Sequence, residues 1–190
     1  MGNQTSIMKK GGIYLLASLL LTIATVHCVS AQAVAKRVVI IRHGEKPDHG
    51  DNLSCQGLNR ALALPAVLYK KIGLPSAIYV PSINTGKSTN VARMYQTVVP
   101  FAIKYNLKIS TKFAVDDAQD LAAAINKQEG TVLVVWEHKE AGKILQALGI
   151  AQKEKWDDAD FDGMWIVTYT NGTPVLTKDT EGLHPSASCQ

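Results

Sequence analysis

Continuous apolar runs alternate with amphipathic stretches along this chain. The run at residues 38–41 is rich in β-branched side chains and is bounded by charge and glycine, as a buried strand is. Residues 131–136 predict another buried strand, and residues 76–80 and 164–169 predict two further strands. Between them, apolar residues recur at helical spacing in a segment opening at Ser54, over residues 91–105 and 118–127, and after His138. We therefore predict an α/β fold, a three-layer sandwich with a mostly parallel central sheet and helices on both faces.

Shorter signals complete the predicted order of elements. Residues 108–113 fit a short edge strand, and Asn171 and Gly172 predict a hairpin turn before a returning strand at 175–177. Pro65 should kink or split the first helix, because proline removes a helical hydrogen bond. The tail from Asp179 carries no periodic pattern, and we expect it to be flexible.

The amino-terminal residues predict an export signal. Lys9 and Lys10 precede an apolar core at residues 13–26, and the small residues Ala31 and Ala33 suit cleavage after position 33. We expect a signal peptide at 1–33, one domain at 34–190, and a periplasmic or secreted bacterial protein with no membrane contact after cleavage. An uncleaved membrane anchor is the alternative.

The length and net charge of the chain further limit the class of protein that it can be. A chain of 190 residues that is 46% hydrophobic is enough for one globular domain. Without Lys9 and Lys10 the formal charge falls from +4 to +2, which is 18 basic minus 16 acidic residues, so nucleic acid is not favoured as a partner. Cys55 and Cys189 remain after cleavage. They suit either one disulfide or two separate thiols, and the sequence does not choose between them.

Residues with catalytic potential follow directly on the first buried strand. Arg42, His43 and Gly44 stand where the strand ends, and in open α/β sheets ligands bind at the carboxyl ends of strands. A guanidinium is a planar fork of donors suited to phosphate oxygens, and a neutral histidine is a nucleophile. Gly44 permits close backbone approach. A simple polar turn would contain similar residues. Whether this turn binds phosphate therefore depends on whether further phosphate ligands are found at the ends of later strands and helices.

Residues 42–47, RHGEKP, resemble the RHGEKP-type members of the histidine phosphatase superfamily, the phosphoglycerate mutase-like proteins. The segment from Leu53 to Ala61, LSCQGLNRA, is similar to the first helix of that family, and we expect Arg60 in it to be structural rather than a phosphate ligand. The resemblance covers most of the mature length. It implies a phosphoglycerate mutase-like fold.

Two later residues extend the resemblance. Arg93 opens a predicted helix in a stretch, RMYQTVVP, that is similar to the second-arginine motif of the family, and helix N-termini favour anions. His138 follows a buried strand as the second histidine of the family does, although Glu137 stands where glycine is more common. The resemblance implies His43 as the nucleophile, with Arg42, Arg93 and His138 binding the phosphoryl group.

A rival motif precedes Arg93. Residues 81–88, PSINTGKS, nearly match a P-loop, but Pro81 stands at the first glycine, where it removes a donor and fixes a torsion that the phosphate cradle needs free. A nucleotide-binding protein is therefore an alternative hypothesis. Otherwise we expect Lys87 to add positive charge at the pocket mouth and to assist substrate binding.

The sequence leaves the proton donor for the leaving alcohol open. Many family members use a carboxylate between the second arginine and the second histidine, and Asp116 or Asp117 fits that order. Glu137 is adjacent to the pocket in sequence, whereas Glu45 follows the nucleophile and can serve to brace its loop. We take Glu137 first and Asp117 second as candidates.

The sequence contains no complete metal motif. Asp158, Asp160, Asp162 and Gly163 imitate the first half of a calcium loop, but Tyr169 stands where the bidentate glutamate belongs. We expect no metal and no cofactor, because phosphoryl transfer needs mainly alignment and charge on the phosphoryl oxygens, which arginines supply.

These residues together predict an exported, metal-independent phosphatase. It would hydrolyse phosphomonoesters of a small-molecule substrate through a phosphohistidine on His43. Besides the P-loop hypothesis, the chain could be an inactive module that keeps the fold and the phosphate pocket. The substrate and the oligomeric state are not encoded in any pattern that the sequence displays.

Overall fold

The computed structural model describes residues 1–2, 36–83 and 92–189, so the expected signal peptide, Lys87 and most of the P-loop-like stretch lie outside the described residues. Within them, one sheet contains β1 (Arg37–Arg42), β2 (Ala77–Tyr79), β3 (Ile109–Ser110), β4 (Thr131–Trp136), β5 (Gly163–Thr170) and β6 (Thr173–Thr180). The helices are α1 (Cys55–Ile72), α2 (Arg93–Tyr105), α3 (Ala118–Ile125) and α4 (His138–Ala147). None of these helices is long and apolar enough to cross a membrane.

The strand order places β1 and β4 side by side in the middle of the sheet. The order is β3-β2-β4-β1-β5-β6, with β3, β2, β4 and β1 parallel and β5 and β6 antiparallel. Arg42 pairs with Trp136, so the segments that follow β1 and β4 leave from the same edge. Because β5 runs the other way, with Met164 opposite Ile41, the segment entering β5 also lies at that edge.

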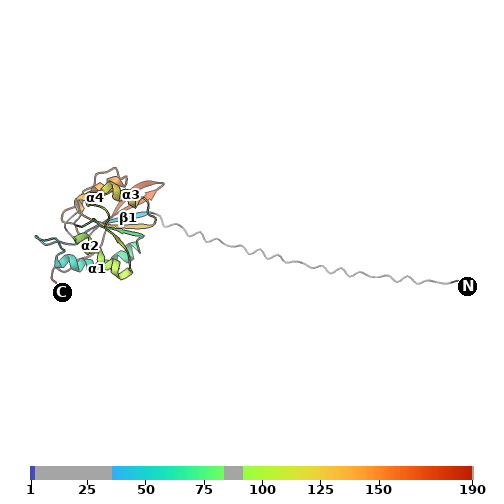
Figure 1. The fold of residues 1–190 in the computed structure, drawn as a ribbon, viewed down its shortest axis with the longest axis horizontal. Helices are drawn as coiled ribbons and strands as arrows, with labels where there is room; N and C mark the ends of the chain where they lie inside the picture. Colours follow the sequence, from blue (N-terminus) through green and yellow to red (C-terminus); the bar gives the residue numbers. More distant parts are fainter. Residues whose placement is uncertain (3–35, 84–91, 190) are drawn as a thin grey trace. The chain divides into compact units, whose positions relative to one another are not determined.

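Helices cover both faces of the sheet, which confirms the predicted three-layer sandwich (Figure 1). On one face α1 and α2 pack against the sheet, and the core there includes Val39, Ile41, Leu64, Phe101 and Leu133. On the other face α3 and α4 pack against the alternate strand residues, and that core includes Val38, Ile40, Leu121, Trp136 and Ile144. Strands β1 and β4 are buried on both faces, which explains their unbroken apolar runs.

Two sequence-based expectations about individual elements need correction. Of the kink or split expected at Pro65, the split does not occur: α1 continues to Ile72, because the buried face of the helix continues on both sides of the proline with Leu64 and Leu68 fully buried. The tail from Asp179 is not free either: β6 extends to Thr180, and a disulfide joins Cys189 to Cys55 at the start of α1. The disulfide settles the open question about these two cysteines.

Candidate active site

His43 is held by its own neighbour in the turn after β1. Its Nδ1 lies 2.7 Å from the carbonyl oxygen of Gly44, which requires Nδ1 to carry the proton and leaves the lone pair on Nε2. The Gly44 N–H donates to Oγ1 of Thr97 in α2 at 2.9 Å, so the turn is tied to a second element. His43 is only 3% exposed. The turn therefore fixes both the orientation of the imidazole and the nitrogen that stays free.

Burial lowers the pKa of His43 to about 4, and the positive charges of Arg42, Arg93 and His138 lower it as well, against the Gly44 hydrogen bond that raises it. The imidazole is therefore neutral across the physiological range. The same result places the two predicted arginines and the second histidine close enough to act on His43. The charged residues that act on His43 therefore come from β1, α2 and α4.

Arg42 is oriented by the loop at residues 157–162, which precedes β5. Its Nη1 donates to the carbonyl oxygens of Asp158 at 2.7 Å and Asp160 at 3.1 Å. The guanidinium carbon lies 3.8 Å from the centre of the Phe161 ring, a cation–π distance. Its Nε is buried and has no hydrogen-bond partner in the described part of the chain. The loop therefore uses one side of the guanidinium and leaves a donor for an anion.

Arg93 occupies the first position of α2, where the sequence predicts it. Its guanidinium donates to the carbonyl oxygens of Gly50 and Asn52, the latter at 3.1 Å. Oγ1 of Thr97, one turn further along, donates to the Arg93 carbonyl oxygen at 2.7 Å, and the same hydroxyl accepts the Gly44 N–H. These bonds tie the amino end of α2 to the turn that carries His43.

His138 is the first residue of α4 and lies directly after β4. Its Nε2 lies 2.9 Å from Oδ1 of Asp158, and its buried Nδ1 has no partner among the described residues. Burial and the charge of Arg42 lower the pKa of His138, whereas Asp158 and Glu137 raise it. Glu137, the N-cap of α4, is half-buried and acts electrostatically on both Arg42 and His138.

Asp117, the second candidate proton donor, lies apart from these contacts. It is exposed at the N-cap of α3, where its Oδ2 accepts the Ala114 N–H at 3.2 Å. It lines a surface pocket with Lys112, Asp120 and Lys127, and none of the residues around His43 lines that pocket. The structure therefore places Glu137, but not Asp117, among the charges that act on the site.

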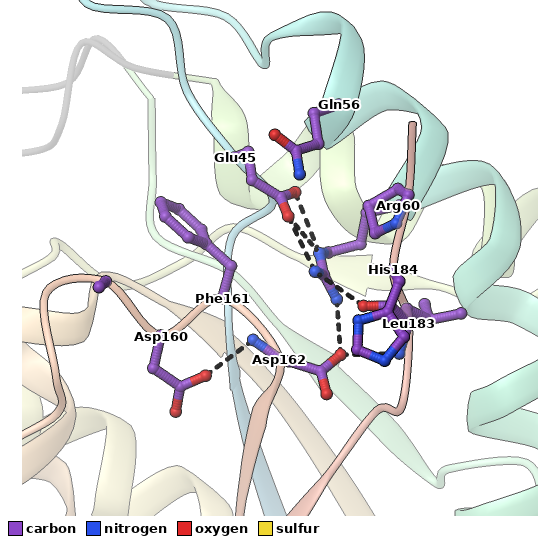
Figure 2. Close-up of a pocket in the computed structure, with 10 residues that line it drawn as sticks. Glu45, Gln56, Arg60, Asp160, Phe161, Asp162, Leu183 and His184 are labelled. Carbon is purple, nitrogen blue, oxygen red and sulfur yellow. Dashed lines mark hydrogen bonds and ion pairs between the residues drawn. The ribbon is translucent and has the colours of Figure 1, made fainter. Parts of the chain in front are cut away.

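Glu45 and Arg60 have the structural roles that the sequence favours. Arg60 is buried and makes a bidentate bond to Glu45, with Nη2 to Oε1 at 2.8 Å, and its Nη1 binds Asp162 at 2.9 Å (Figure 2). Nη1 also binds Glu181 at 2.6 Å. One guanidinium thereby joins the turn after β1, the loop before β5 and the tail after β6. These segments, together with Phe161, border a pocket of about 490 Å³.

Two glycines let α1 pack directly on the turn after β1. A Cβ on Gly57 would collide with the backbone of Glu45, and a Cβ on Gly44 would lie 2.9 Å from the Gly57 carbonyl oxygen. Ser54 caps the helix by accepting the Gly57 N–H, and its own N–H donates to Glu45 at 2.9 Å. The serine and glycine of the LSCQG stretch are therefore explained by close packing of backbone on backbone.

The sequence does not reveal the site roles of Asp158 and Phe161. The carboxylates of this loop imitate the first half of a calcium loop, but Oδ1 of Asp160 accepts the N–H groups of Asp162 and Gly163, each at 2.8 Å. Across the described residues, no three His, Cys, Asp or Glu side chains are arranged to hold a metal ion. An aromatic residue inside an acidic loop, Phe161, was the one available signal.

Comparison with known proteins supports the fold. No family model matches the chain, and no curated protein matches it by sequence. Among solved structures, the protein histidine phosphatase SixA in complex with tungstate superposes with a TM-score of 0.56 at 18% identity, covering 76% of this chain and 97% of that one. The fold is that of the histidine phosphatase superfamily. A mycobacterial glucosyl-3-phosphoglycerate phosphatase with inorganic phosphate has a TM-score of 0.55 at 15% identity, covering 77% of this chain and 96% of that one.

Proposed function

We propose that this protein is a phosphatase that hydrolyses phosphomonoesters through a covalent phosphohistidine on His43. The observation that carries the proposal is the state of that imidazole: Nδ1 is bound to the Gly44 carbonyl, the pKa is lowered by burial to about 4, and the charges of Arg42, Arg93 and His138 act on it. A neutral imidazole with its free nitrogen amid positive charge is suited to attack an anionic phosphoryl group.

The first step transfers the phosphoryl group to the enzyme. Nε2 of His43 forms the N–P bond while the bond from phosphorus to the leaving oxygen breaks. Arg42, through its free Nε, and Arg93 would hold the phosphoryl oxygens, so that attacking and leaving atoms stay in line. Lys87, outside the described residues, would add charge at the pocket mouth.

The second step returns the enzyme to its starting state. Water attacks phosphorus, the N–P bond breaks, and inorganic phosphate leaves. Neither step uses a metal ion or a cofactor. Of the two carboxylates that the sequence offers as proton donors, Glu137 is the better placed, because its charge reaches Arg42 and His138.

The substrate and the compartment belong to the same proposal. The two structures with the same fold hold tungstate and inorganic phosphate, both tetrahedral oxyanions, which supports a small phosphorylated molecule as the substrate. The disulfide between Cys55 and Cys189 suits an oxidising compartment and so supports export, with a signal peptide at 1–33 and the phosphatase domain at 34–190. A periplasmic or secreted location follows.

The test uses the chain without residues 1–33 and a panel of phosphate esters in EDTA. A denaturing quench at alkaline pH during turnover should trap a phosphoenzyme that is stable to base and acid-labile, as a phosphorylated nitrogen is. His43→Ala should abolish both the phosphoenzyme and turnover. Phosphate binding without turnover would contradict the proposal and leave an inactive binding module. ATP hydrolysis that requires magnesium and is lost in Lys87→Ala would favour the nucleotide-binding alternative instead.

A further inference from the structure

Asp158 makes contacts to two of the groups that surround His43. Its carbonyl oxygen accepts from Arg42 at 2.7 Å, and its side-chain Oδ1 accepts from Nε2 of His138 at 2.9 Å. The side chain is 70% exposed, while that of His138 is 9% exposed, so the carboxylate reaches from solvent to the buried imidazole. The two contacts use different atoms, and a side-chain substitution therefore leaves the backbone contact to Arg42 in place.

The contact with Asp158 determines which nitrogen of His138 is available. Because Nε2–H donates to the carboxylate, the remaining nitrogen is Nδ1, which is buried and has no partner in the described part of the chain. A carboxylate on one side of an imidazole stabilises the protonated ring, which can then donate from the other side. His138 is thus arranged to carry a proton on Nδ1 near His43.

Resting on the proposed function, we infer that Asp158 is a positioning residue that holds His138 as the proton donor to the leaving oxygen. In the first step the Nδ1 proton of His138 moves to the leaving oxygen as the P–O bond breaks and the bond from His43 to phosphorus forms. In the second step the neutral His138 takes a proton from the attacking water as the N–P bond breaks. No further acid is needed, and neither Glu137 nor Asp117 carries the proton.

The charges facing His138 define the expected pH dependence. Burial and Arg42 lower the pKa of His138, and the contact with Asp158 raises it again. The other charged or titratable groups around it lie on several elements: His43 after β1, Glu137 and Lys139 at the start of α4, and Glu154 and Lys155 before the 157–162 loop. The hydrogen bond to His138 lowers the pKa of Asp158, so the carboxylate is ionised where His138 titrates.

The decisive measurement compares two leaving groups on the same phosphoryl group. A p-nitrophenolate leaves without a proton, whereas an alkoxide such as that from p-nitrobenzyl phosphate requires one. Asp158→Asn should lower kcat/KM for p-nitrobenzyl phosphate by about tenfold, because the donor is less often protonated, and change kcat/KM for p-nitrophenyl phosphate little. With the benzyl ester, the alkaline limb of the pH profile should also move to lower pH.

A double variant tests whether Asp158 acts through His138. His138→Ala should lower kcat/KM for the benzyl ester by roughly 100-fold or more, and adding Asp158→Asn should then have no further effect. Asp157→Asn is the matched control, because this neighbouring carboxylate accepts only the Ala159 N–H, at 2.8 Å, among the described residues. It should leave both esters and the pH profile unchanged.

Three outcomes would overturn the inference. Equal losses with both esters in Asp158→Asn would make His138 a ligand of the phosphoryl oxygens only. A benzyl-selective loss in Glu137→Gln would return the acid role to that carboxylate. An additive loss in the double variant would show that Asp158 acts independently of His138. Failure of the proposed function is distinct, because the wild-type chain would then form no phosphohistidine with either ester.

Discussion

The turn after β1 and a second, irregular region, which consists of the loop at residues 157–162 and the tail after β6, are built in opposite ways. The turn is fixed by short contacts with regular elements: Gly44 bonds to Thr97 in α2, and Glu45 accepts from Ser54 at the start of α1. The second segment is irregular and acts over long separations, with Asp158 bonding to a residue 116 positions earlier. A local sequence motif encodes the first region. The second region depends on the tertiary fold, which brings distant residues together.

The two regions therefore differ in role: the first carries the groups proposed to react, and the second orients them. Arg42 at the end of β1 and His43 in the turn are the proposed phosphate ligand and the proposed nucleophile, and the contacts of the turn determine the protonation of His43. The irregular segment supplies carbonyl oxygens, one ring and carboxylates that orient those groups. Substitutions at the first region should therefore affect the catalytic rate most. Substitutions in the second region should affect the free energy of unfolding and its pH dependence more. Three substitutions test this division.

The largest effect is expected where the two regions meet, at Arg42. Arg42→Lys keeps the charge but loses the planar guanidinium. In the wild type, Nη1 of this group binds two carbonyl oxygens, and Nε is left for the proposed substrate. We expect kcat/KM to fall by roughly 10²–10³-fold, as when a preorganised donor to the transition state is removed. Steady-state kinetics with p-nitrophenyl phosphate measure it.

Arg37→Lys is the matched control for that substitution. Arg37 lies in the same strand but at the opposite end, where it donates to the Ile72 carbonyl oxygen at 2.9 Å. Its replacement should leave kcat/KM unchanged. Wild-type activity in Arg42→Lys would contradict a role for the planar guanidinium and would show that only the positive charge at this position matters.

The second effect concerns the disulfide of the irregular segment. Replacing Cys55 and Cys189 together by serine removes a cross-link between positions 134 residues apart. We expect the free energy of unfolding to fall by about 2–5 kcal/mol, because a long loop in the unfolded chain is no longer closed. Urea denaturation of the oxidised wild type, the reduced wild type and the double variant measures it.

Activity should respond much less than stability to the same change. Glu181 still binds Arg60, and Asn59 still donates to the carbonyl oxygens of Ser186 and Ser188, at 2.8 and 2.9 Å, so the tail keeps its place in the folded state. A large loss of kcat in the folded double variant would show that the tail does more than stabilise.

The smallest effect is a pH-dependent one at Glu181. Burial raises the pKa of this carboxyl to about 8, although Arg60 lowers it. Its Oε1 has no partner among the described residues, and Glu45 and Asp162 share the same guanidinium, so Glu181 is the carboxyl that keeps a proton. In the unfolded chain it ionises near 4.5. Wild-type stability should therefore be fully present at low pH and decline as the pH rises toward 8.

Glu181→Gln should remove that decline, because an amide does not ionise. Above pH 8 the variant should be more stable than the wild type by about 1–2 kcal/mol, and below pH 4.5 the two should be alike. Free energies of unfolding across the pH range measure the difference. Glu129→Gln, at an exposed carboxylate, is the control. A variant that is less stable at every pH would show that Glu181 is ionised and paired with Arg60.

The sequence predicts the regular part of this molecule well and the irregular part poorly. The buried runs of β1 and β4 locate Arg42, His43 and His138, because a strand buried on both faces has a readable pattern and its end is marked by charge. Asp158 acts partly through its carbonyl oxygen, which every residue has, so no residue type reveals that contact. The sequence does not reveal the role of Glu181 in the tail, because a single buried hydrogen bond to Arg60 has no period.

The antiparallel arrangement of β5 and β6 has one practical consequence. Both the chain that enters β5 and the chain that leaves β6 arrive beside the carboxyl end of β1, yet neither belongs to the parallel part of the sheet. The stretch at residues 151–155 can therefore be varied while the central strands keep their register and Asp158 and Asp160 keep their contacts with Arg42. Anyone wishing to retarget this scaffold to another ester should start there, with the turn that carries His43 left intact.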